Sequence, residues 1–142
     1  MIETVLVQLL TNDPAIGGAV GSRVYPLQGK SFKDDEFPFI TYQRDSTARN
    51  YTLTGQSDPT SATMTMNIIG TDYTLQKELA ENIRRRLSSA SGEYQGMKVN
   101  WIRIDNELDS LVIPTDGAEF GLPTITMTLT AHFDEVKPNQ GD

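Results

Sequence analysis

SATMTMNIIGTDYTLQKELAENIRRRL, which runs from Ser61 to Leu87, joins the clearest strand pattern of the chain to its clearest helix pattern. As far as Ile68, apolar side chains alternate with mostly polar ones, and this period of two is typical of a half-buried strand. After Gly70, Thr71 and Asp72 offer side-chain oxygens to the first free N–H groups of a helix. One helical stripe follows, formed by Leu75, Leu79, Ala80, Ile83 and Leu87. The stretch therefore predicts a strand and a helix that supply two faces of one core.

The length of 142 residues fits one domain, which we expect to span residues 1–135 and to be followed by a flexible tail over 136–142. The chain has no cysteine, which excludes disulfide scaffolds, thiolate chemistry and cysteine-ligated zinc. No apolar run approaches the roughly 20 residues that cross a bilayer, and the N-terminus lacks the features of a signal peptide, so we expect no membrane contact. Nineteen acidic and twelve basic side chains give a net charge of −7, which repels nucleic acid.

Before the central stretch, the spacing predicts an amphipathic helix over 2–10 and a short helix that opens at Asn12-Asp13-Pro14. RVYPL, residues 23–27, reads as a short strand at an edge or a strand end, because Pro26 cannot donate to a ladder. Aromatic and β-branched residues predict a strand over 37–44. The long polar segment 45–60 is predicted to be a projecting loop or hairpin that contacts a partner.

After the central stretch, a Ser/Gly turn region over 88–96 leads into a strand over 97–104, which residues 105–111 extend. Residues 112–123 are rich in proline and glycine and predict a second projecting loop. The cleanest alternation of the chain, over 125–134, predicts the last strand. The fold class that follows is α+β, with a mostly antiparallel sheet of about five strands and the two main helices on one face. The Thr-rich opposite face is either solvated or in contact with a neighbouring subunit.

No residue pattern indicates catalysis or a cofactor. His132 is the only histidine, it lies among the threonines of the last strand, and no serine sits in a G-x-S-x-G elbow. The glycines of IGGAVGS follow no strand and do not match a phosphate-binding loop. We therefore expect His132 to be a partly exposed strand residue, and the protein not to be an enzyme and to hold no cofactor.

Asp105, Glu107 and Asp109 form the least trivial polar cluster, because a strand would place all three carboxylates on one face. Such a face can bind a hard cation, but the spacing lacks the glycine and the distal glutamate of an EF-hand loop. Acidic runs are usually solvated, so no metal site is predicted. A carboxylate pair for acid–base chemistry would need a pocket that raises a pKa, and the sequence indicates none.

Two further groups of residues have both a structural and a functional interpretation. The end of the predicted helix, at Arg84, Arg85 and Arg86, is either solvated or binds phosphate or a carboxylate of a partner. Arg49, Asn50 and Tyr51 combine an arginine and an aromatic residue in a polar loop, as in interface hot spots, or pack on their own domain. Trp101 and Tyr42 are most simply core or core-edge residues.

The order of these patterns resembles the tail completion proteins of long-tailed bacteriophages and prophages, also called tail terminator or head–tail joining proteins. The resemblance runs from residue 2 to about residue 133. The motifs that carry it are the D-P turn, RVYPL, the strand P-F-I-T-Y-Q-R, the loop R-x-Y-T-L-x-G, and the alternating strand that leads into TDYTLQKELAENIRRRL. The loop over 112–123 departs from the family, since it is longer and more acidic than usual.

The resemblance implies an α+β subunit that assembles as a ring, commonly hexameric, at the tail–head junction of a virion assembled in the host bacterial cytoplasm. The ring caps the tail tube, stops its elongation and meets the head connector or stopper protein. DNA passes through without specific binding, which an acidic lumen favours. We expect Asp105, Glu107 and Asp109 to line that lumen.

Ring closure requires two different surface patches that match head to tail. The basic helix end at Arg84–Arg86 and an acidic loop of the next subunit are the candidate pair. The acidic residues of that loop are Asp34, Asp35 and Glu36.

Two alternatives to the terminator role stay open. One is a different tail or baseplate component built on a similar sheet. The other is a small α+β enzyme or ligand-binding domain whose site lies under the long loops; the shortage of histidine, cysteine and glycine-rich motifs counts against it.

Overall fold

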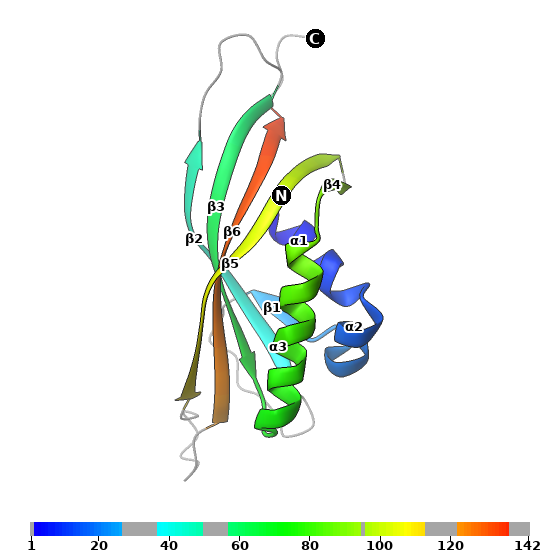
Figure 1. Cartoon of the computed structure of the whole chain (residues 1–142), viewed down its shortest axis with the longest axis vertical. Coiled ribbons are helices and arrows are strands. Elements are labelled where there is room, and N and C mark those ends of the chain that lie inside the picture. The colour runs from blue at the N-terminus through cyan, green and yellow to red at the C-terminus, as the bar shows by residue number, and fades with distance from the viewer. Residues whose placement is uncertain (1, 27–36, 50–56, 95, 113–121, 137–142) are drawn as a thin grey trace.

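The computed structural model describes residues 2–26, 37–49, 57–94, 96–112 and 122–136 (Figure 1). Three helices and six strands follow one another along this part of the chain. In order they are α1 (Ile2–Thr11), α2 (Pro14–Val20), β1 (Val24–Pro26), β2 (Phe39–Arg49), β3 (Ser57–Ile69), α3 (Tyr73–Ser88), β4 (Gly92–Tyr94), β5 (Met97–Val112) and β6 (Leu122–Val136).

The strands form one sheet in the order β1-β2-β3-β6-β5-β4. The α+β class is confirmed, but the prediction of a mostly antiparallel sheet of about five strands is wrong: the sheet has six strands and is mixed. The sixth strand, β4, lies in the predicted turn region and pairs with the start of β5. The sheet is mixed because β1 runs parallel to β2, whereas the other neighbouring pairs are antiparallel.

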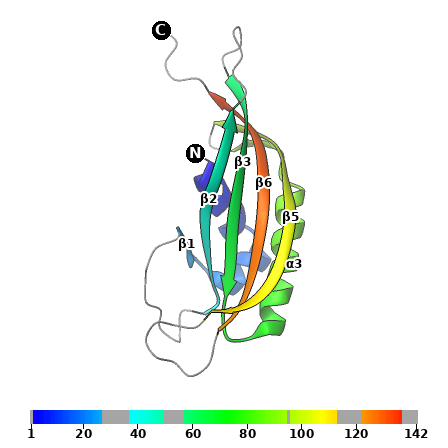
Figure 2. The ribbon, with the colours of Figure 1, turned by 90° about the vertical axis from the view of Figure 1, so that its left-hand side faces the viewer.

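All three helices lie on one face of the sheet, and the opposite face is left uncovered by them (Figures 1 and 2). The alternating apolar residues of β3 and β6 point toward the helices and are buried, as are the apolar stripe of α1 and that of α3 from Leu79 onward. Fully burying one such side chain contributes roughly 1.5–3 kcal/mol. The strand and the helix of the opening stretch therefore do share one core.

The helix α3 differs from prediction in one turn. Asp72 is its N-cap, and its side chain accepts from the N–H of Leu75. However, Leu75 is 40% exposed, and the polar Gln76 occupies the buried position instead. The Gln76 amide donates to the carbonyl oxygens of Ile68 (3.1 Å) and Pro123 (2.7 Å), at the ends of β3 and β6. Hydrogen bonds thus explain a polar residue in the predicted apolar stripe.

The long strands bend at β-bulges. The register shifts between Arg44 and Ser46 in β2, and between Ile104 and Asn106 in β5. A bulge adds one residue to a strand and increases its local twist. The bulge at Asp45 lets β2 continue into the segment predicted as a loop, so that 45–49 and 57–60 are strand and form the base of a hairpin.

Other predicted segments are only partly described. The loop over 112–123 is bounded by Val112, the last residue of β5, and by Leu122 and Pro123, which already belong to β6. The predicted tail beyond residue 136 lies outside the described residues. Within the described part of the chain, no helix has the length and apolarity that crossing a membrane requires.

Candidate assembly surfaces

The face of the sheet opposite the helices, called the open face below, is lined by hydroxyl groups. Its centre is formed by Thr63 and Thr65 of β3 and by Thr128 and Thr130 of β6, which pair across the two central strands and are half-buried. Threonine suits this position because its branched side chain favours a strand while its hydroxyl tolerates water. The open face is therefore polar at its centre, as predicted.

An aspartate flanks this threonine patch on either side, and each occupies a β-bulge. Asp45 in β2 accepts hydrogen bonds from Gln43 (2.6 Å) and from the hydroxyl of Thr65. Asp105 in β5 accepts from Nε of Arg103 (2.6 Å) and from the hydroxyl of Thr130. The two sites mirror each other: the side chain two residues earlier and a threonine of the adjacent central strand fix each carboxylate.

The hydrogen bond from Thr130 and the neighbouring Arg103 hold the pKa of Asp105 below its usual range, although partial burial opposes this. Asp105 is therefore negative throughout the neutral pH range, at a fixed place on the open face.

The three acidic residues of β5 do not share one face, which corrects the prediction from their spacing. Residue 105 is the extra residue of the bulge, so the alternation reverses after it. Glu107 and Asp109 pair with Met127 and Ile125, which point toward the helices. Only Asp105 lies on the open face.

Lys77 of α3 binds the two remaining carboxylates, at 3.3 Å from Glu107 and 3.1 Å from Asp109. The hydroxyl of Tyr73 also donates to Asp109. These bonds lower the pKa of Asp109, Tyr73 contributing most and Lys77 next, and Asp109 in turn raises the pKa of both partners. The group links α3 to β5 across the helix-covered side.

An exposed stack of side chains lies at the other end of β5. The rings of Trp101 and His132 are nearly parallel, with centroids 5.3 Å apart, and the guanidinium of Arg103 lies 5.1 Å from the Trp101 ring. Trp101 was predicted to be a core or core-edge residue, but it is 39% exposed, and the register places it opposite His132 on the open face.

His132 is half-buried, in line with the prediction of a partly exposed strand residue. Its Nδ1 lies 2.9 Å from the side-chain amide of Asn100, which also donates to Asp134. Within the described residues, no cluster of side chains suits a metal ion.

Two of the arginines at the end of α3, Arg84 and Arg85, bind within their own chain. Arg85 lies 3.3 Å from Asp13, the buried N-cap of α2, and Arg84 pairs with Glu81 one turn earlier. Burial tends to raise the pKa of Asp13, but the backbone N–H groups of Ile16 and Ala15, together with Arg85, lower it overall. Arg85 therefore connects α3 to α2, a role that its sequence did not indicate.

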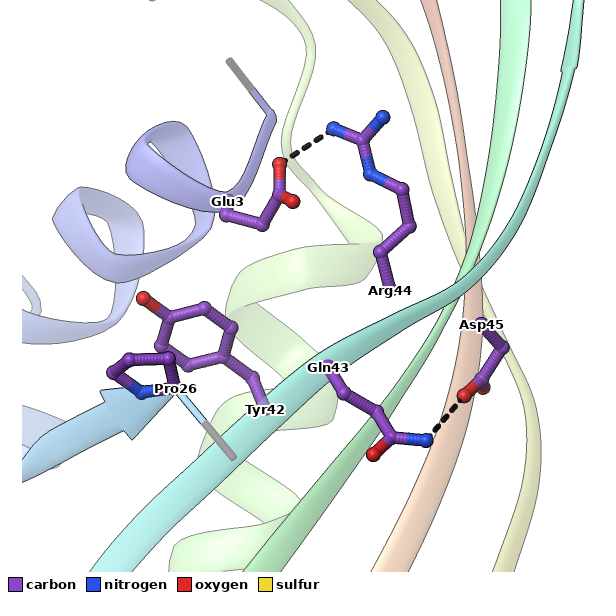
Figure 3. A pocket seen from close by; sticks show the side chains of 6 residues that line it. All are labelled: Glu3, Pro26, Tyr42, Gln43, Arg44 and Asp45. Carbon is purple, nitrogen blue, oxygen red and sulfur yellow. Dashed lines mark hydrogen bonds and ion pairs between the residues drawn. The ribbon is translucent and has the colours of Figure 1, made fainter. Parts of the chain in front are cut away.

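One open hollow of about 490 Å³ lies between the start of α1 and the middle of β2 (Figure 3). Arg44 and Glu3 form an ion pair of 2.5 Å at one end, and Gln43 and Asp45 bond to each other at the other end. Burial, and to a lesser degree Glu3, raise the pKa of the Tyr42 hydroxyl between them. Since its charged groups bind one another, the hollow is a junction between α1 and the sheet.

Several predicted contact residues lie outside the described part of the chain. They are Asp34, Asp35, Glu36, Asn50 and Tyr51. Their neighbour Arg49 is the last residue of β2 and is exposed.

A model of the family described as "Tail completion protein gp17" matches residues 4–111, which is most of the chain. The chain belongs to this family. Its members are structural proteins of phage tails, so this tail completion protein is a component of a phage or phage-like virion. The resemblance drawn from the sequence motifs is confirmed.

A solved structure shares the fold of this tail completion protein. A chain in the structure described as the virion of a native gene transfer agent particle aligns with a TM-score of 0.65, covers 91% of each chain and is 14% identical. No curated protein sequence matches. The family match ends within β5, whereas the structural match is long enough to include part of β6, which is central in the sheet.

Sequence reasoning placed Asp45 of this tail completion protein in the projecting segment 45–60 and missed its position on the open face of the sheet. The one available signal was an aspartate that interrupts a run of strand-forming residues, which is typical of a bulge as well as of a loop. Nothing in the spacing distinguished the two.

Proposed function

We propose that this protein caps the phage tail tube as a hexameric ring, stops tube elongation and joins the tail to the head connector, without acting as an enzyme. The observation that carries the proposal is the tail completion family match over residues 4–111, which takes in all three helices except the first residues of α1. A similar fold in the virion of a gene transfer agent supports a role inside a particle.

The open face is the surface that we assign to the DNA channel. It carries hydroxyl groups between two fixed carboxylates, Asp45 and Asp105, and has no helix covering it. Like charges repel DNA, so a polyanion slides along such a wall instead of adhering to it. Of the residues first expected in the lumen, Asp105 keeps this role. Glu107 and Asp109 are replaced by Asp45, because they lie on the helix side, where Lys77 binds both.

A head-to-tail contact between the end of α3 and the acidic segment Asp34–Glu36 of the next subunit remains part of the proposal. Arg85 already binds Asp13 and Arg84 pairs with Glu81, so Arg86 is the arginine assigned to this contact. Arg86→Glu is the appropriate test because Arg85→Glu also disturbs α2. Loss of the ring at low salt would support this contact between subunits, and an intact ring would contradict it.

The test of the function is electron microscopy of particles made without this protein. Failure of termination predicts tails of uncontrolled length that are not attached to heads, and the wild-type chain supplied in trans should restore both length and attachment. Tails of normal length that lack a different part would instead indicate another tail or baseplate component. A monomer that binds a small molecule, seen by native mass spectrometry, would indicate a ligand-binding domain.

A further inference from the structure

The outer edge of β5 is long and unpaired within the described residues. β6 pairs with one side of β5, and β4 pairs with the other side only over Met97–Val99. On that outer side, β5 continues to Val112 with no neighbouring strand in the described chain. An edge of this length offers a row of backbone N–H and C=O groups to another strand.

The direction of these backbone groups follows from one hydrogen bond. The N–H of Gly70, directly after β3, donates to the carbonyl of Pro123, so the backbone polar groups of Pro123 face β3. Leu111 pairs with Pro123 and must therefore direct its own N–H and C=O away from β6. By alternation, Asp109 and Glu107 do the same.

Exposed apolar side chains gather along the same edge. Trp101, Leu108 and Leu111, all on β5, are 39%, 48% and 68% exposed, and Tyr73, which is 44% exposed, donates to Asp109 of this strand. Large apolar groups concentrated on one strand indicate a contact surface. They flank the unpaired backbone groups on both faces of the sheet.

The opposite side of the sheet ends in a second edge, formed by β2. Here β1 covers only Ile40–Tyr42. The N–H of Ile40 donates to the carbonyl of Arg23, directly before β1, so the backbone polar groups of Ile40 point away from β3. By alternation those of Arg44 point the same way, and beyond the bulge so do those of Thr47. Among the described residues, β1 does not extend to Arg44 or Thr47.

We propose that the β5 edge of one copy pairs with the β2 edge of the next, so that the sheet continues from subunit to subunit around the ring. This pairing rests on the proposed function, because it describes how neighbouring subunits of the proposed ring contact each other. Because β2, β3, β6 and β5 are successively antiparallel, β5 runs opposite to β2. Rotation about an axis along the strands keeps these directions, so the new pair is antiparallel. The edges differ, as closure of a ring requires.

A proline at position 107 tests the backbone contact. The N–H of Glu107 faces outward, so Glu107→Pro keeps the β5–β6 ladder, and Glu107→Ala is the matched control that also loses the ion pair with Lys77. Both variants should unfold at a similar temperature as monomers. The proline variant should lose the ring in native mass spectrometry and the alanine variant should keep it. A ring that survives Glu107→Pro, with that variant folded, overturns the proposal.

Cysteine crosslinking identifies the partner edge, and the natural absence of cysteine makes the background clean. Particles containing Arg103→Cys in β5 together with Ser46→Cys or Ala48→Cys in β2 are treated with a short bismaleimide. The double variants should give a ladder of covalent oligomers, whereas each single variant and the control pair Arg103→Cys with Glu81→Cys should stay monomeric.

The outcomes separate this inference from the function on which it rests. A dimer from Arg103→Cys alone would mean that two β5 edges meet, which overturns the pairing. An intact ring with no ladder from either double variant overturns the edge contact and leaves the capping role standing. Absence of a ring from assembled particles overturns both proposals.

Discussion

The amide of Gln76 in α3 donates a hydrogen bond of 2.7 Å to the carbonyl of Pro123 in β6, across the buried end of the sheet. The same amide bonds to Ile68 at the end of β3. A fully buried glutamine thereby holds a helix and the two central strands together. Gly70 leaves it room, because a Cβ there would lie 3.1 Å from the Gln76 side chain.

We predict that Gln76→Leu lowers the free energy of unfolding by about 1–3 kcal/mol, because two buried carbonyl groups lose a donor. Gln8→Leu, on the exposed side of α1, is the matched control and should change stability little. Urea denaturation of the two variants measures the difference. Equal stability would mean that water satisfies these carbonyls.

We predict that Asp13 makes stability depend on pH through its lowered pKa. A folded-state pKa below the ordinary aspartate value of 3.8 stabilises the fold above that pH, and the contribution is lost as the pH falls through the folded-state pKa. Asp13→Asn keeps a side chain that can cap α2 but removes the charge. Thermal unfolding should show the variant less stable at pH 7, with a difference that narrows as the pH falls below 3.8; a constant difference would contradict this.

The elements that the sequence predicted well are those with one strong period. The stripe of α1 and the alternation over 61–69 and 125–134 all correspond to buried residues. The parallel pairing of β1 has no local signal, because it depends on how the chain returns after residues that the structure does not describe. β4 has only three residues, too few to show a period.

The candidate site was harder to predict because bulges reverse the alternation. One extra residue at 105 moves Glu107 and Asp109 to the other face, and one at 45 turns a predicted loop into strand. Arg85 illustrates a second limit: its partner, Asp13, lies 72 residues away in the sequence. Helix spacing shows which residues share a turn, and not which side chain from another helix approaches them.

We predict that reversing charge on the open face impedes DNA passage. The double variant Asp45→Lys with Asp105→Lys places cations in the proposed channel, where they attract phosphate. Glu78→Lys with Glu81→Lys, at two exposed positions of α3, changes the net charge equally but on the helix side, and serves as the control. Triggered DNA release from assembled particles should slow only for the first variant, and added salt should restore the rate. Equal slowing of DNA release in both variants would contradict the assignment of the open face to the DNA channel.

We predict that Trp101, the sole tryptophan, reports assembly of the ring through its emission wavelength. It is 39% exposed and lies on β5, beside the unpaired edge of the sheet. When the β2 edge of the next subunit pairs with the β5 edge, part of the indole loses contact with water, so the emission should shift to shorter wavelength. An unchanged emission wavelength in assembled rings would contradict the edge contact.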